Sequence, residues 1–303
     1  MRRHILLATA AFLAVAPVAR AQRDESLQKI DTTFAFSKGG SVNLGHVSGD
    51  IIVTGWTKGE VKIYATIETG YLDASLSSSR VSITARSRRN RMGKSRYELS
   101  VPIGTEVRAS SVSGNVVVRG VGGEVNVTAV SGDVEVRDAG DRVEMETVSG
   151  DIRSSKLRGR IRANSVSGDI TLEDIDGAVA GKSVSGSLTV RGALTGMDFE
   201  SVSGDLDFAG DLKGDGSYRA STHSGDVRLT LPSNIGATLE LQTYSGDVRP
   251  GFPITLQPGE EPLNRRNRRM RFAVNGGGPR ISLETFSGDI IIERGAARAP
   301  KED

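Results

Sequence analysis

The chain contains no cysteine among its 303 residues. Without cysteine an exported protein has no disulfides, so its stability must come from burial of apolar side chains and from backbone pairing. The same absence excludes zinc–thiolate sites, thiol catalysis and attachment of a lipid to an N-terminal cysteine.

Aromatic residues and proline are also scarce. Aromatics make up 5% of the chain, and 9 prolines stand against 37 glycines. This composition is typical of a β-rich protein with many tight turns around a core of small aliphatic side chains. No useful length of sequence has the 3.6-residue period of an amphipathic helix, so we expect an all-β fold.

Long apolar runs are confined to the N-terminus. The apolar run from Ile5 to Val18 follows the basic residues Arg2 and Arg3 and precedes Ala19-Arg20-Ala21. This order predicts a secretory signal peptide over residues 1–21, and the run is shorter than the roughly 20 residues that an uncleaved membrane anchor needs. We therefore expect an exported protein, periplasmic, secreted or at the cell surface, with no transmembrane segment in the mature chain.

Charge is nearly balanced overall but unevenly placed. The full chain has 39 Lys+Arg and 37 Asp+Glu, and loss of Arg2, Arg3 and Arg20 with the leader leaves 36 against 37. Two short basic segments, residues 86–96 and 265–271, hold much of the positive charge. The rest of the mature chain is therefore acidic.

A strict repeat is the strongest signal in the sequence. Within "VSGDITLEDIDGAVAGKSVSGSLTV" the opening Val-Ser-Gly recurs before the end of the stretch, and the residues between follow a similar order. The intervals between the serines of successive Ser-Gly pairs are 18 five times, then 21 twice, then 42, which we interpret as two periods of 21. These serines are Ser113, Ser131, Ser149, Ser167, Ser185, Ser203, Ser224, Ser245 and Ser287. Such a period predicts a solenoid in which each repeat is one coil.

Aligning the sequence at a step of 18 predicts which side chains stack. Three columns are apolar: Val125, Val143, Ile161, Val179, Met197; Val134, Ile152, Ile170, Leu188, Leu206; and Val130, Val148, Val166, Val184, Val202. Each coil has two alternating strands and two corners, which leaves one packed layer inside and no room for a ligand. Strict alternation from Val143 would place Val148 outside, so we expect a bulge near Glu146 and Thr147.

The fold prediction is thus a parallel β-solenoid (β-helix) of coils of about 18–21 residues with an N-terminal β cap. A single domain covers residues 22–294, with an irregular cap region over 30–112 and regular coils over 113–294. An excursion loop is expected near 250–270, and a loose tail over 295–303.

The Ser-Gly-Asp motif is interpreted as turn chemistry. Glycine reaches left-handed conformations, and serine and aspartate accept hydrogen bonds from turn amides. We assign structural turns to Ser149, Gly150, Asp151, Ser167, Gly168 and Asp169. The alternative is a row of calcium-binding carboxylates at Asp133, Asp151, Asp169 and Asp205, but Asn115 and Ser187 break the row. No metal or other cofactor is expected.

Catalytic residue types are few. His223, Ser224 and Asp226 contain the residue types of a triad, but they are crowded into one turn that recurs without histidine, and geometry must define a triad. The mature chain keeps only two histidines, His46 and His223. We expect no enzymatic activity.

The basic segments are candidate anion-binding loops. Both contain similar strings, "RRNRM" and "RRNRRM", and both precede a strand, so they are expected to be hairpin tips that lie close together. The candidates are Arg86, Arg88, Arg89, Arg91, Arg265, Arg266, Arg268 and Arg269. Anionic lipid, lipopolysaccharide and acidic polysaccharide are the polyanions available outside the cell, whereas simple solvated loops are the alternative. Nucleic acid is not expected, because no aromatic stacking platform accompanies the arginines.

Longer strings carry a resemblance to a known family. They are "YELSVPIGTEVRASSVSGNVVV", the V-S-G-D-[IV] repeats, "LTLPSNIGATLELQTYSGDV" and "GGGPRISLETFSGDIII". With them the chain resembles the DUF4097 family of "putative adhesins" over residues 30–294. The resemblance implies a β-solenoid with an envelope or secreted role and brings no catalytic residues.

These observations together predict a non-enzymatic, exported envelope or surface protein that acts as an adhesin-like binding module. The alternative is a self-associating scaffold whose coils join end to end, as in bactofilins, which have coils of similar length but no signal peptide.

Overall fold

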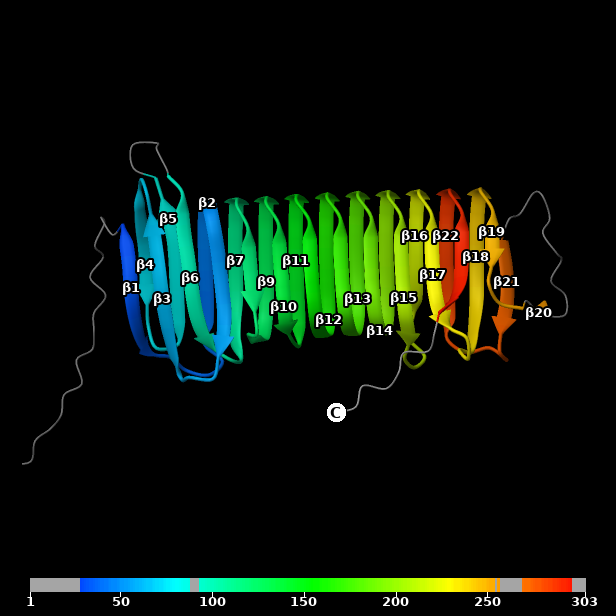
Figure 1. Cartoon of the computed structure of the whole chain (residues 1–303), viewed down its shortest axis with the longest axis horizontal. Helices are drawn as coiled ribbons and strands as arrows, with labels where there is room; N and C mark the ends of the chain where they lie inside the picture. Colours follow the sequence, from blue (N-terminus) through cyan, green and yellow to red (C-terminus); the bar gives the residue numbers. More distant parts are fainter. Residues whose placement is uncertain (1–27, 88–92, 254, 257–268, 296–303) are drawn as a thin grey trace, which may run out of the picture.

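The computed structural model describes residues 28–87, 93–253, 255–256 and 269–295. Within these ranges there are 23 strands and no helix. The strands lie side by side in one long stack of coils (Figure 1). The predicted all-β, parallel solenoid is confirmed.

Each regular coil has two walls. We call the strands that run into the Ser-Gly turn the front wall, and the strands that leave it the rear wall. Strands of the front wall are β7 (Thr105–Ser113), β9 (Gly122–Ser131), β11 (Arg142–Ser149), β16 (Tyr218–Ser224), β18 (Ala237–Ser245) and β22 (Arg280–Ser287). Strands of the rear wall are β8 (Val116–Arg119), β10 (Val134–Ala139), β15 (Leu206–Leu212), β17 (Val227–Pro232), β19 (Val248–Pro250) and β23 (Ile290–Gly295).

Some strands pass through a corner and contribute to both walls. Those that begin in the rear wall and end in the front wall are β12 (Ile152–Ser167), β13 (Ile170–Ser185) and β14 (Leu188–Ser203). Strand β2 (Ser41–Trp56) begins in the front wall and ends in the rear wall. The backbone therefore stays extended around much of each coil.

The register between coils follows the step of 18 seen in the sequence. Val143 pairs with Val125 on one side and with Ile161 on the other, and the row continues through Val179 to Met197. These five side chains are at most 3% exposed. The second column, from Val134 to Leu206, is equally buried. Both predicted core columns are confirmed, and together they fill the space between the walls.

The C-terminal coils do not stack in sequence order. Strand β22 pairs with β16 on one side and with β18 on the other, and β23 likewise lies between β17 and β19. The last coil of the sequence is thus inserted one coil earlier in space, as Figure 1 shows at the red and yellow strands. The interpretation of the interval of 42 as two stacked periods is wrong. Ser245 and Ser287, which are 42 residues apart, pair directly with no coil between them, and Ser287 pairs with Ser224 on its other side.

The N-terminal region has a similar insertion. Strand β2 pairs with β7 and β8 on one side. On its other side it pairs with β5 (Arg80–Arg86) and β6 (Ser95–Pro102), which precede β7 in the chain. Ser48 is in register with Ser113. The stack therefore extends into residues 30–112, where an irregular cap was expected.

Antiparallel strands lie at both ends of the stack. At the N-terminal end these are β1 (Lys29–Ala35), β3 (Glu60–Ile67) and β4 (Tyr71–Leu76), paired through β5 and β6. At the other end β21 (Arg269–Val274) pairs with β18, and β20 (Thr255–Leu256) pairs with β21. Parallel pairing thus ends at both extremes, although a capping role for residues 30–112 stays a prediction.

Candidate functional site

Strict alternation places the third apolar column on the surface. In β11 the side chains of Val143, Met145 and Thr147 point into the core. The alternate positions point outward, and Val148 is 47% exposed. The bulge expected near Glu146 and Thr147 is absent, since β11 keeps an unbroken register there with β12. The prediction that this column packs inside the solenoid is wrong.

The exposed column runs across ten coils of the front wall. We call it the front ladder, and in spatial order it consists of Val47, Val112, Val130, Val148, Val166, Val184, Val202, His223, Phe286 and Tyr244. Its apolar members are between 42% and 71% exposed. Because neighbouring strands lie about 4.8 Å apart, the ladder is about 43 Å long.

The C-terminal end of the front ladder is aromatic. Phe286 stacks between His223 and Tyr244, and its ring centroid lies 4.8 Å from each of theirs. The planes differ by only 10° and 4°. This contact depends on the inserted coil, because the insertion places β22 between β16 and β18.

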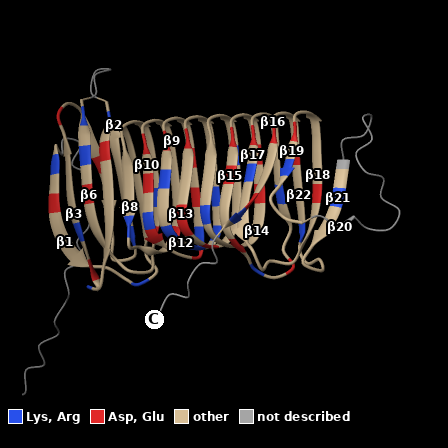
Figure 2. Ribbon diagram, turned by 45° about the vertical axis from the view of Figure 1, so that its right-hand side comes forward, with Lys and Arg blue, Asp and Glu red and all other residues tan. Residues whose placement is uncertain are grey.

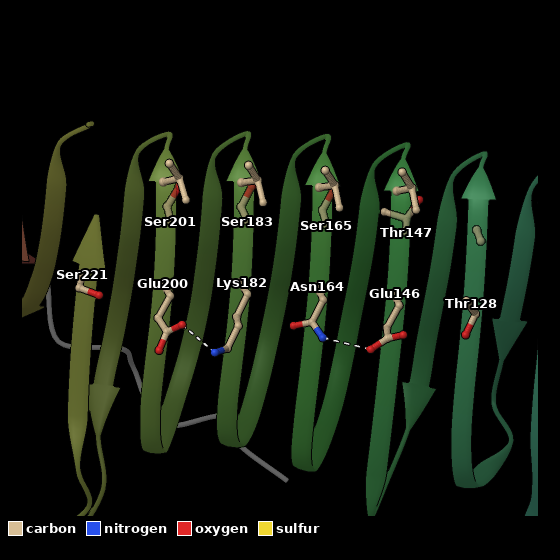
Figure 3. Close-up of a pocket in the computed structure, with 15 residues that line it drawn as sticks. Thr128, Glu146, Thr147, Asn164, Ser165, Lys182, Ser183, Glu200, Ser201 and Ser221 are labelled. Carbon is tan, nitrogen blue, oxygen red and sulfur yellow. Dashed lines mark hydrogen bonds and ion pairs between the residues drawn. The ribbon is translucent and has the colours of Figure 1, made fainter. Parts of the chain in front are cut away.

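A shallow pocket of about 630 Å³ lies along the valine part of the ladder. Polar side chains of neighbouring coils form its lower side and interact in pairs (Figure 3). The Asn164 amide donates a hydrogen bond to Glu146 at 3.2 Å, and Lys182 forms an ion pair with Glu200 at 2.6 Å. The front wall therefore presents an apolar stripe beside a polar one, which is suited to binding another molecule.

The Ser-Gly-Asp turns form a second ladder, which is structural. The Asp169 amide donates to Asp151 Oδ1 at 2.9 Å, and the Ser187 amide donates to Asp169 Oδ1 at 2.8 Å. Ser149 and Ser167 pair directly at the end of the front wall. The aspartates thus tie successive coils together, whereas the sequence interpretation had them accept hydrogen bonds within their own turn.

The turn glycines are required by close approach between coils. A Cβ at Gly168 would overlap the carbonyl oxygen of Gly150, and one at Gly150 would overlap that of Gly132. The φ of Gly168, +150°, adds a backbone conformation that other residues rarely adopt.

The four aspartates of the calcium alternative are already engaged. Each of Asp133, Asp151, Asp169 and Asp205 accepts the amide of the corresponding position in the next coil through Oδ1. Arg153 pairs with Asp133 at 3.4 Å and with Asp151 at 2.6 Å. In the part of the chain that the structure describes, no three His, Asp or Glu side chains gather as metal ligands. The described hydrogen bonds therefore account for these aspartates as links between coils.

The strands that border the two arginine-rich segments lie at opposite ends of the stack. Arg86, the last residue of β5, pairs with Asp73 at 3.4 Å near the N-terminal end, whereas Arg269 begins β21 at the C-terminal end (Figure 1). The expectation that the two loops lie close together concerns residues outside the described ranges and stays a prediction. Six candidates lie outside the described residues: Arg88, Arg89, Arg91, Arg265, Arg266 and Arg268.

Neither His46 nor His223 belongs to a triad. His223 stacks on Phe286, and Asp226 Oδ1 accepts the amide of Asp289 at 2.8 Å. His46 is 5% exposed and lies between the hydroxyls of Ser95 and Ser111, at 3.1 and 2.8 Å. Burial lowers the pKa of His46 to about 4, against a smaller opposite effect of Asp50, so it is a neutral core residue at physiological pH.

The fold and the site define a class of protein: a parallel β-solenoid whose flat walls carry ladders of like side chains. The family follows from the sequence, since residues 104–191 and 159–293 match the model described as Toastrack DUF4097. The chain belongs to this family. No curated protein matches it.

Several crystal structures match the chain with low sequence identity. A putative cell adhesion protein from Clostridium sporogenes has 9% identity and a TM-score of 0.23, over 88% of this chain and 100% of that one. A putative lipid binding protein from Parabacteroides distasonis has 13% sequence identity and a TM-score of 0.39, over 90% of this chain and 98% of that one. A putative adhesin from Parabacteroides merdae has 10% sequence identity and a TM-score of 0.34, over 88% of this chain and 96% of that one. These similarities carry no argument about function.

Among the described residues, no helix has the length and hydropathy needed to cross a lipid bilayer.

Proposed function

We propose that the chain is a non-enzymatic, exported protein of the cell envelope or cell surface that binds a partner through its front wall. The single observation that carries this proposal is the front ladder. Soluble monomeric proteins rarely expose long contiguous apolar surfaces, and those that do mostly use them for binding. The signal peptide that the sequence predicts over residues 1–21 supports export.

The front ladder is not needed for the solenoid core. Its valines contact solvent, while the column beneath them, including Thr147 and Ser165, is buried. Threonine is almost the same shape as valine and is favoured in strands. Threonine would serve the fold equally well at these exposed positions, so the valines are better explained by a role in binding than by a role in folding.

The test is retention of the mature protein on isolated cell envelopes, measured by co-sedimentation. The variant Val148→Thr/Val166→Thr/Val184→Thr removes apolar surface from the middle of the ladder. A matched control changes three outward apolar residues of the rear wall: Ile52→Thr, Val117→Thr and Ile291→Thr. We expect about tenfold weaker retention or more for the ladder variant, because each exposed methyl group contributes to apolar contact. Equal retention of both variants would contradict the proposal.

A scaffold made by end-to-end joining is less well supported. Such joining requires parallel coils at the ends, as in the interior of the stack. Here β1, β3 and β4 at one end and β20 and β21 at the other are antiparallel to the strands they pair with. Filaments of the mature protein in electron micrographs would favour the scaffold instead.

We also propose that the arginine-rich segments add an electrostatic contact with anionic lipid, lipopolysaccharide or acidic polysaccharide. Neither residues 86–96 nor residues 265–271 include an acidic residue, so their positive charge is not balanced within the segment. Reversing the charge of Arg88, Arg89, Arg265 and Arg266 is expected to abolish the salt-sensitive part of retention on anionic surfaces. Unchanged salt dependence would remove this contact from the account.

A further inference from the structure

A second hollow opens on the front wall, below the polar side chains that line the first pocket. Its volume is about 460 Å³. Small residues form its floor: Ala178, Ala180 and Gly196. Arginines from neighbouring coils surround this floor: Arg142, Arg160, Arg162 and Arg219. We call this set of residues the arginine hollow.

The strand register gives the width of the arginine hollow. Arg162 pairs with Ala180, Ala180 with Asp198, and Asp198 with Arg219. Three steps between neighbouring strands separate the two arginines, which is about 14 Å. This distance accommodates a sugar ring together with its substituents, lying on the alanine and glycine floor.

The arginine hollow has an excess of positive charge, since four arginines stand against two carboxylates, Glu144 and Asp198. Glu144 neutralises Arg162 through an ion pair of 3.2 Å. Among the described residues, no carboxylate lies within ion-pair distance of Arg142, Arg160 or Arg219. Arg142 and Arg160 lie directly opposite each other on neighbouring strands, an arrangement of like charges that is unfavourable without an anion between them. The hollow is therefore preorganised for a negatively charged group.

The surroundings favour a discrete anionic group over a charged membrane. Charges of both signs are spread along the stack (Figure 2). Asp198 lines the hollow, next to Arg219, and Glu146 and Glu200 line the neighbouring pocket. An anionic lipid surface pressed against this wall would meet these carboxylates and be repelled. A single carboxylate at Arg142 and Arg160 would instead meet two neighbouring guanidinium groups that have no described ion pair.

We propose that the arginine hollow binds a carboxylate-bearing sugar residue of an acidic polysaccharide. Guanidinium groups bind carboxylates in a planar, bidentate geometry, and the small apolar floor offers a surface for the ring of the sugar. The open hollow lets a polymer continue across the wall in both directions. The inference rests on the proposed role as a binding module and names one ligand class for it.

The test is affinity electrophoresis of the folded mature protein in gels that contain polygalacturonate. Arg160→Gln removes one unpaired guanidinium, and Ala178→Leu fills the floor without any change in charge. Arg191→Gln is the matched control, because Arg191 is exposed on the rear wall without a described ion pair. We expect about tenfold weaker retardation for the first two variants and an unchanged one for the control. Fully methyl-esterified polygalacturonate is expected to cause no retardation.

Several results would overturn the proposal. Equal loss in Arg191→Gln would mean attraction to net charge only, and normal binding by Ala178→Leu would mean that the hollow is not the site. Stronger, Arg160-dependent binding to inorganic phosphate or to phosphatidylglycerol vesicles would assign the hollow to a phosphate group. If polygalacturonate is not bound at all while the front-ladder variant still loses envelope retention, the hollow is wrongly assigned and the proposed function stands.

Discussion

Phe286 and Tyr244 lie face to face, with ring centroids 4.8 Å apart and planes within 4°, although β19, β20 and β21 lie between them in the chain. Insertion of the last coil between two earlier ones places β22 next to β16 as well as next to β18. On its other face Phe286 contacts His223, so three residues from separate parts of the sequence continue the front ladder. The aromatic end of the proposed binding surface is therefore a product of strand order.

The inserted order can be tested by disulfide formation, since the chain has no native cysteine. Ser224, Ser245 and Ser287 are exposed at the same position of three coils. Cysteine pairs at 224 and 287, or at 287 and 245, are one strand apart and are expected to cross-link under mild oxidation. The pair at 224 and 245 is two strands apart, about 9.6 Å, which is beyond disulfide reach. Cross-linking of 224 with 245, as sequential stacking requires, would refute the insertion.

Substitution of Gly168 by valine is expected to destabilise the solenoid by about 3 kcal/mol or more. A side chain there overlaps the backbone of the preceding coil and requires a conformation that valine avoids. The measurement is chemical denaturation, with Gly59→Val as the control, because a Cβ at Gly59 meets no atom within 4 Å. Similar stability of the two variants would show that coils do not approach closely at the turn.

The second ladder, in which each turn aspartate accepts an amide of the next coil, predicts how substitution of Asp151 changes stability. Asp151→Ala leaves the Asp169 amide without its acceptor and is expected to cost about 1–2 kcal/mol. Asp151→Asn keeps an acceptor and should be nearly neutral, since Asn115 Oδ1 accepts the Asp133 amide at 3.0 Å in the native chain. Thermal melting of both variants, with calcium and with a chelator, is the measurement. A melting temperature that rises with calcium in the native protein only would revive the metal alternative.

His46 predicts a specific pH dependence of stability. Its pKa in the folded state is about 4, below the value of about 6.5 in the unfolded chain, so the unfolded state takes up a proton first. The free energy of unfolding should therefore fall by about 3 kcal/mol as the pH drops from 6.5 to 4. His46→Thr should lack this component, and His223→Val should keep it. Parallel pH profiles for the native protein and His46→Thr would contradict the buried, neutral histidine.

Much of the fold could be predicted from the sequence, because stacking gives the same position of every repeat the same environment. The columns of Val143 and Ile152 follow directly from this period, and so do the turn glycines. The order of the last coils could not be predicted from spacing. The interval from Ser224 to Ser287 is a multiple of 21, and so is the interval from Ser245 to Ser287, so both pairings are compatible with the period.

The candidate site was missed for a different physical reason. Alternation alone placed Val148 outside, but the apolar character of its column favoured burial, and a bulge was invoked to reconcile the two. The backbone alternation prevailed because the register is unbroken on both sides of Val148, where Thr147 pairs with Ser165 and Ser149 with Ser167. The arginine hollow was equally hidden, since the repeat of 18 pairs Arg142 with Arg160, whereas Arg219 faces them across small residues only through the register of three further strands.

The most direct test of the central claim is carbene footprinting of the mature protein, free and bound to isolated cell envelopes. If the front wall is the binding surface, labelling of Val148, Val166 and Val184 should fall on binding, while labelling of Val117 and Ile291 on the rear wall should stay constant. Equal labelling of the front-ladder valines in both states, with protection elsewhere, would contradict the account.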